Sequence, residues 1–196
     1  FCIFNLLNRE NTMRFINFIY KNFIKLGFIS ALLVSFSANS ETILISNEGS
    51  DNITIIDLKT YEVIATIDSG NRPRDMHYVA NSNSLLVAAS EDDTINIIDM
   101  NTYEIIGNLE TGDDPEIFDI SPNGKIAVVS NEDDNAATVI DVNTGKIIRV
   151  IEDVGIEPEG VNFSPDGKLV YITSEGTNTV LIIDPWAGKI IEEVLV

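Results

Sequence analysis

A phrase of about 42 residues recurs along this chain, and it constrains the fold more than any other feature. In each copy, one strand-like segment ends in an aspartate. These aspartates are Asp57, Asp99, Asp141 and Asp184, at intervals of 42, 42 and 43 residues. A period of about 40–45 residues made of short strands is the sequence signature of propeller blades. The sequence therefore predicts an all-β fold, a β-propeller of four-stranded blades with about four blades in this chain.

Each copy divides into four short strands, A to D, separated by turn signals. In the third copy, strand A is predicted at 116–121 and strand B at 126–130, joined by Pro122-Asn123-Gly124-Lys125. Asn-Gly predicts a tight type I′ hairpin, in which both central residues have positive φ. Strand C is expected at 54–56, 95–98, 137–140 and 179–183, and strand D at 63–67, 105–109, 147–151 and 190–194. We interpret the repeated aspartate after strand C as a structural turn residue, because Asp readily accepts backbone N–H bonds in turns.

The first copy is shorter than the others. Residues 41–68 supply strands B, C and D but no strand A, and three complete copies follow up to Val196. Propellers avoid exposed sheet edges by completing one blade with strands from both chain ends. We therefore expect the chain to be the front part of a larger ring, whose first blade lacks strand A.

Residues 13–40 have the pattern of a secretory signal peptide. Arg14, Lys21 and Lys25 are basic, 26–38 are apolar, and small residues precede a predicted cleavage before Glu41. An apolar stretch of 13 residues is shorter than the roughly 20 of a membrane helix, so we expect cleavage and no stable membrane span, with a retained anchor as the alternative. Residues 1–12 are expected to be an unstructured upstream segment. The predicted location is periplasmic or secreted.

The mature chain, predicted to be 41–196, is acidic and free of cysteine. It has 30 acidic and 8 basic residues, and the one cysteine, Cys2, lies before the predicted start. A surface of this sign repels phosphate backbones, which argues against nucleic acid as a partner. It suits cations or a basic protein, or is simply a solvated surface. Without cysteine, disulfides and thiolate metal sites are excluded from 41–196.

The repeats resemble the YVTN-type β-propeller repeats of exported bacterial and archaeal proteins. The resemblance is carried by S-P-D-G-K-L-V-Y-I-T (164–173), N-T-V-L-I-I-D (178–184) and G-x-x-P openings such as 70–73. Within that group the chain is most similar to the PQQ-dependent catabolism-associated β-propeller family, through phrases at 46–52, 70–75, 114–125, 130–135 and 154–168. The resemblance implies an exported, seven-bladed propeller associated with PQQ-dependent alcohol oxidation, with no known reaction of its own.

Charged residues in the D-to-A and B-to-C connections are the candidates for binding, because both connections emerge on one face around the channel of a propeller. The ligand-binding candidates are Arg72, Arg74, Asp75, Glu116 and Glu159 from the first connection and Glu48, Glu132 and Glu175 from the second. His77, Asp119 and Asn162 share one position in successive A strands and are expected to line the channel. The arginines could clamp a ligand carboxylate or pair with acids of neighbouring blades.

No cofactor or metal is predicted. A ring of carboxylates could hold Ca²⁺, but no stretch matches a calcium-binding loop. His77 has no second histidine to accompany it as a haem ligand, and G-x-S-x-G, H-E-x-x-H, G-x-G-x-x-G and G-K-[ST] are all absent. We therefore expect a non-catalytic binding or accessory module that holds a protein partner or a small ligand on its propeller face. A propeller subunit of a quinoprotein or haem oxidoreductase and a surface-layer or adhesion propeller are the alternatives.

Overall fold

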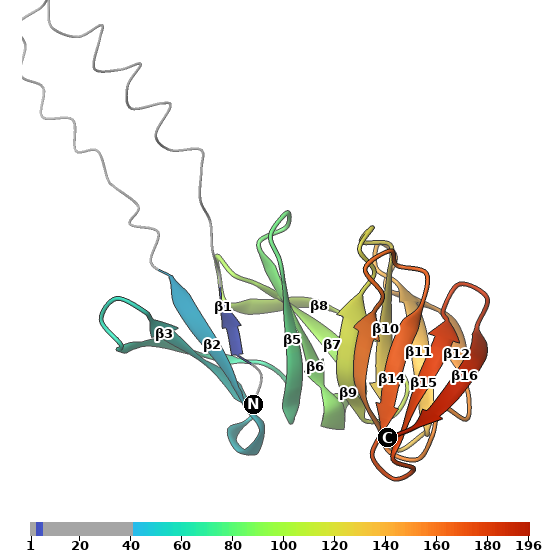
Figure 1. Ribbon diagram of the computed structural model, residues 1–196. Helices are drawn as coiled ribbons and strands as arrows, with labels where there is room; N and C mark the ends of the chain where they lie inside the picture. The colour runs from blue at the N-terminus through green and yellow to red at the C-terminus, as the bar shows by residue number, and fades with distance from the viewer. Residues whose placement is uncertain (1–2, 6–40) are drawn as a thin grey trace, which may run out of the picture.

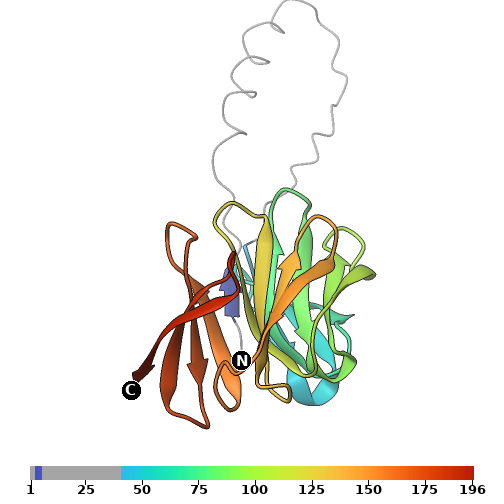
Figure 2. The same cartoon turned by 90° about the vertical axis from the view of Figure 1, so that its right-hand side faces the viewer.

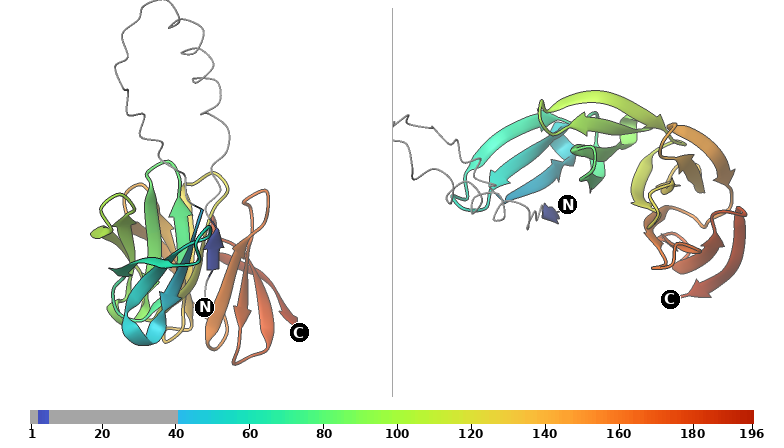
Figure 3. Two further views of the ribbon diagram at one scale, coloured as in Figure 1. Left: turned by 90° about the vertical axis from the view of Figure 1, so that its left-hand side faces the viewer. Right: turned by 90° about the horizontal axis from the view of Figure 1, so that it is seen from above.

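Four antiparallel sheets of four strands each stand side by side in an open arc (Figure 1). The computed structural model describes residues 3–5 and 41–196, so the predicted signal peptide lies outside the described residues. Seen from above, the sheets follow one curve with their last strands on the convex side (Figure 3). This architecture confirms the predicted β-propeller of four-stranded blades. In the described residues, no helix has the length and apolar character of a membrane span.

The four sheets are named blades 1 to 4 in chain order. Blade 1 contains β1 (Ile3–Asn5), β2 (Thr42–Asn47), the 3-10 helix η1 (Glu48–Ser50), β3 (Asn52–Asp57) and β4 (Val63–Asp68). Blade 2 contains β5 (Pro73–Val79), β6 (Ser84–Ala89), the 3-10 helix η2 (Ser90–Asp92), β7 (Thr94–Asp99) and β8 (Glu104–Glu110). Blade 3 contains β9 (Pro115–Ile120), β10 (Ile126–Asn131), β11 (Ala136–Asp141) and β12 (Lys146–Ile151). Blade 4 contains β13 (Pro158–Phe163), β14 (Val170–Ser174), β15 (Thr179–Asp184) and β16 (Lys189–Leu195).

Blade 1 has one strand more than the sequence predicted. β1 pairs antiparallel with β2, with Ile3 opposite Ile45 and Asn5 opposite Ile43. It takes the position next to β2 that strand A takes in the other blades, whereas the sequence predicted no strand A here and no structure before Met13. An edge strand presents a row of unpaired N–H and C=O groups, and a short extended segment can satisfy part of that row.

The core lies between the blades. Every residue of β6 and of β10 is buried, because neighbouring blades cover both faces of these central strands. Three apolar clusters fill the three junctions. Leu44 and Ile53 meet Met76 between blades 1 and 2, Ile95 meets Phe118 between blades 2 and 3, and Val139 meets Ile172 between blades 3 and 4.

The repeated aspartates close turns, as predicted. Asp57 Oδ1 accepts hydrogen bonds from the N–H groups of Lys59 (2.7 Å) and Thr60 (2.9 Å). Asp141 and Asp184 accept the corresponding pairs in blades 3 and 4, with all four distances at 2.9 Å. The Oδ1 atom of each of these aspartates therefore serves the turn that follows its strand.

The A-to-B hairpin of blade 3 differs from the predicted type I′ turn. Gly124 has a φ of +69°, but Asn123 is not among the residues with positive φ. The N–H of Gly124 donates to Ser121 (2.7 Å) and that of Ser121 donates to Ile126 (2.9 Å). Pro122 fixes its own φ near −65°, which favours a type I turn followed by a left-handed glycine over the I′ form.

Connections between strands gather at the two ends of the blades, as Figure 2 shows. The D-to-A and B-to-C connections lie together at one of these ends, because hydrogen bonds join them at each junction. This end, which we call the mouth, carries the candidate site.

Candidate functional site

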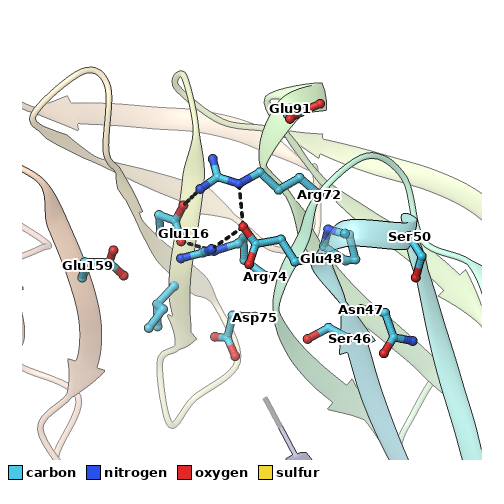
Figure 4. A pocket seen from close by; sticks show the side chains of 13 residues that line it. Ser46, Asn47, Glu48, Ser50, Arg72, Arg74, Asp75, Glu91, Glu116 and Glu159 are labelled. Carbon is cyan, nitrogen blue, oxygen red and sulfur yellow. Dashed lines mark hydrogen bonds and ion pairs between the residues drawn. The ribbon is translucent and has the colours of Figure 1, made fainter. Parts of the chain in front are cut away.

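An open cavity of about 840 Å³ lies at the mouth and is lined by residues of all four blades. Figure 4 shows its charged side chains converging from β5, β9, β13 and η1. Six of the eight predicted ligand-binding residues line it: Glu48, Arg72, Arg74, Asp75, Glu116 and Glu159. Glu132 and Glu175, the other two, do not line this cavity.

Backbone hydrogen bonds to side-chain oxygens hold the D-to-A loops in place. Asp51 of blade 1 accepts the N–H of Arg72 (2.9 Å), and Asp92 of blade 2 accepts the N–H of Asn71 (2.8 Å). The next junction repeats this arrangement, in which Asp93 and Asp134 accept the N–H groups of Asp114 (3.1 Å) and Asp113 (2.9 Å). Much of the acidic character of the mouth is therefore structural, because these carboxylates bind loop amides and are not free for a ligand.

The loop residue before each opening proline adopts an unusual backbone conformation. Arg72, Asp114 and Glu157 have φ values of +50°, +48° and +53°. Few non-glycine residues have positive φ, and the residue before a proline favours extended conformations, so these loops store strain. The side-chain oxygens of the preceding blade hold the loops in this conformation, which places Arg72 at the cavity.

The two arginines of blade 2 connect blade 1 to blade 3. Arg72 places Nε 3.1 Å from Glu48 Oε1 and Nη1 3.1 Å from Asp114 Oδ1. Arg74 places Nη1 3.0 Å from the same Glu48 oxygen, and its Nε contacts Oε2 of Glu116 (Figure 4). Arg72 Nη2 is 3.7 Å from Glu116 Oε1. In this structure the arginines therefore pair with acids across the blades, one of the two roles that the sequence left open.

Glu116 is the buried acid of this network. Its side chain is 0% exposed, and neither oxygen meets hydrogen-bond geometry, although both lie at ion-pair distance from an arginine. Burial raises the pKa of Glu116 to about 8, which Arg74 and Arg72 oppose and which Glu159 and Asp114 reinforce. Burial therefore favours the protonated form of Glu116 more than it would for an exposed carboxyl group.

The cavity has a basic side and an acidic side. On the basic side, the hydrogen bond from Arg72 and the charge of Arg74 lower the pKa of Glu48. On the acidic side, burial raises the pKa of Glu159, and the charges of Glu132 and Glu175 add to this effect while Arg74 opposes it. A group bound in the cavity would meet both signs of charge within one space.

The predicted channel-lining residues lie on the inner A strands, where two of them take part in joining blades. Asp119 accepts the N–H of Phe163 in blade 4 (2.7 Å) and that of Ile120 (2.8 Å). His77 places Nε2 3.2 Å from Asp75, and its ring centroid lies 4.6 Å from that of Phe118. Asn162 is exposed.

His77 has a raised pKa. Burial opposes the charged form of the ring, but the hydrogen bond to Asp75 and the charges of Asp75 and Asp119 outweigh it. The carboxylate that holds His77 also accepts the N–H of Phe118 at 3.3 Å from blade 3. The histidine thus belongs to the junction between blades 2 and 3.

A carboxylate cluster offers the best metal-like spacing among the described residues. Asp114, Glu116 and Glu132 bring one oxygen each within 4.8 Å of one another, a separation that Ca²⁺ could bridge. Arg72 already supplies positive charge to Asp114 and Glu116. Sequence reasoning missed Asp114, and the signal that could have found it is the charge change at its repeat position, where blade 2 has Arg72.

Comparisons with known proteins agree with this architecture. A family model described as YNCE-like beta-propeller matches residues 76–195. A chain of the structure titled Kuenenia stuttgartiensis Hydrazine Synthase is 28% identical with a TM-score of 0.71; the match covers 79% of this chain and 46% of that one. This chain thus spans less than half the length of that relative. A comparison with curated proteins gives no significant match. In all, 1182 chains of solved structures match, so the fold alone does not select a function.

Proposed function

Because this chain belongs to the YNCE-like β-propeller family, we propose that it is a non-catalytic binding module whose mouth cavity holds a ligand through Arg72 and Arg74. One observation carries the proposal: two arginines project into an open cavity of about 840 Å³ whose walls come from four blades. Propellers commonly place binding residues at the ends of the blades, where loops vary while the sheets stay fixed.

The ligand class that suits these arginines is a carboxylate. A guanidinium matches a carboxylate in planar shape and charge, and both arginines already bind one carboxylate oxygen, that of Glu48. Nη1 and Nε of Arg74 contact carboxylates of two different blades, so this guanidinium already lies where carboxylate groups gather. The resemblance to PQQ-associated propellers suggests the setting, an exported accessory of PQQ-dependent alcohol oxidation, and PQQ carries carboxylate groups.

Titration calorimetry with PQQ tests the proposal. We expect saturable binding to the wild-type protein and at least about tenfold weaker binding to Arg74→Gln, because a hydrogen bond to a charged group contributes about 1.5–3 kcal/mol. Arg149→Gln is the matched control, since Arg149 donates to Ala187 (3.0 Å) on blade 4 and does not line the cavity. Binding that is equal in all three proteins would place the ligand elsewhere, and no binding would exclude PQQ.

A second candidate is a propeller subunit of an oxidoreductase. The observation that favours it is the similarity to a chain of a structure titled as a hydrazine synthase, an enzyme by name. Under this reading the same mouth would contact another subunit or domain. Purification of the tagged protein from its native membrane and soluble fractions, followed by absorption spectroscopy for haem, separates the two candidates. A stoichiometric haem-containing complex would favour the subunit.

A further inference from the structure

Glu48 holds the arginines from the exposed side of the cavity. A single oxygen, Oε1, lies 3.1 Å from Arg72 Nε and 3.0 Å from Arg74 Nη1. The Glu48 side chain is 53% exposed, whereas the other two partners of the arginines, Asp114 and Glu116, are 15% and 0% exposed. Of the three carboxylates, Glu48 is therefore the one that solvent, or a ligand, reaches most directly.

The segment that carries Glu48 is lightly held. None of the three residues of η1 is buried, and a side chain added at Gly49 would meet nothing within 4 Å. Among the described residues, the Glu48 side chain forms hydrogen bonds or ion pairs with the two arginines alone.

The charge around the arginines fits the exchange of one carboxylate for another. With Glu48 moved aside, Arg72 and Arg74 would face Asp114 and Glu116. Because burial raises the pKa of Glu116, this carboxyl group neutralises less of the arginines' charge than an exposed carboxylate would, and the arginines would have positive charge to spare. With Glu48 in place this surplus is neutralised, so a second carboxylate would find little attraction.

We propose that Glu48 is an internal stand-in for the ligand, which occupies the arginine pair in the free protein and is displaced when a carboxylate binds. The proposal rests on the proposed function and adds to it a built-in competitor. Because the Glu48 ion pairs must break before a ligand binds, their free energy lowers the affinity for every ligand. Binding of the ligand would also release η1 from the arginines. The loop at the mouth would then have two states, one with Glu48 on the arginines and one with Glu48 displaced.

The test compares three proteins in calorimetric titrations with citrate, a simple carboxylate probe. Glu48→Gln should bind citrate about fivefold more tightly than the wild type, because an exposed ion pair contributes up to about 1 kcal/mol. Glu91→Gln removes the same charge from an exposed residue of η2 at the rim of the cavity, but Glu91 forms no ion pair with either arginine. It measures the gain due to net charge alone, which the gain in Glu48→Gln should exceed.

A readout without ligand separates this inference from the proposed function. Phenylglyoxal modifies accessible arginine side chains, and peptide mass spectrometry reports the rate at Arg72 and Arg74. Faster modification in Glu48→Gln than in Glu91→Gln would support the stand-in even if neither PQQ nor citrate binds. Equal citrate affinity in Glu48→Gln and the wild type would overturn the stand-in while PQQ binding could still hold. Equal modification rates without citrate binding would overturn it as well.

Discussion

Gly70 occupies a place in the D-to-A loop where a side chain has no room. Its φ is +86°, and a Cβ here would lie 2.3 Å from Asn96 Nδ2 and 2.7 Å from Asp92 Oδ2. Those two atoms hold the loop, since Asn96 donates to the carbonyl of Ser69 (3.1 Å) and Asp92 accepts the N–H of Asn71. Gly70, which has no side chain, therefore allows this loop to take the conformation that shapes the mouth.

Gly70→Ala should lower the free energy of unfolding by at least about 2 kcal/mol, because it combines a strained φ with a clash against two hydrogen-bonded side chains. Gly49→Ala is the matched control, with no neighbour within 4 Å and a change expected within about 0.5 kcal/mol. Urea denaturation measures both. Similar midpoints for the two variants would contradict this account of the loop.

Glu116 predicts a pH dependence of stability. A carboxyl group whose pKa is raised on folding binds more protons in the folded state, so its contribution is complete below pH 4.5 and is lost as pH rises towards about 8. Glu116→Gln keeps the shape of the protonated acid and should flatten this decline, by up to about 1.4 kcal/mol per pH unit. Denaturation of both proteins at intervals between pH 5 and 8.5 measures the difference, and parallel curves would show that Glu116 stays ionised.

Sequence reasoning found the arginines of the cavity but not all of their partners. Arg72 and Arg74 were identifiable because they are basic residues in connections that otherwise carry acids. Asp114 was missed as a partner because its contact with Arg72 spans 42 residues and depends on the positive φ of both. The sequence also could not show that Glu116 is fully buried, since its counterparts Arg74 and Glu159 are not.

Strands of neighbouring blades are joined by side-chain carboxylates as well as by apolar packing. Asp119 on β9 reaches the N–H of Phe163 on β13 at 2.7 Å, and Phe163 is buried. Removal of this acceptor would leave a buried donor without a partner, which costs about 1–3 kcal/mol.

Asp119→Ala should therefore destabilise the protein by about 1–3 kcal/mol and raise the hydrogen-exchange rate of the Phe163 amide. Asp133→Ala removes an exposed acid of the same blade for which no hydrogen bond occurs among the described residues, and it should change stability by less than about 0.5 kcal/mol. Unfolding by urea and exchange followed by NMR measure the two effects. An unchanged exchange rate of the Phe163 amide in Asp119→Ala would contradict a stabilising role for this hydrogen bond.

The sequence repeat predicted most of the strands, but it did not predict the features in which the structure departs from the repeat. The predicted strand C of 179–183 and the observed β15 (Thr179–Asp184) agree within one residue, because periodicity aligns four copies of one pattern. The shift of register in each outer strand was not predicted, although it repeats beside Ile64, Ile106, Ile148 and Ile191. A β-bulge adds one residue to a strand, and no residue type in these strands signals its position. β1 was missed because it lies far outside the repeat.

The molecule as a whole carries a charge of −19, with acids concentrated at the mouth. Such a charge destabilises a compact state through self-repulsion, and salt screens it within about 10 Å at 0.1 M. An increase in sodium chloride from about 20 to 300 mM should raise the thermal unfolding midpoint by several degrees. Potassium chloride at equal ionic strength is the control and should act alike. A lower midpoint would mean that attractive exposed pairs such as Arg74–Glu48 outweigh the repulsion.

Blade 2 carries Arg72 and Arg74 where blade 3 carries Asp114 and Glu116, and this difference limits where a blade could be duplicated or lost. The blades share one sequence pattern, and an apolar cluster fills each of the three junctions. A unit with acids at the positions of Arg72 and Arg74, inserted between blades 2 and 3, would put like charges against the buried Glu116. An extra unit after blade 3 would leave that pairing intact. A unit inserted between blades 2 and 3 should therefore be tolerated less well than one inserted after blade 3.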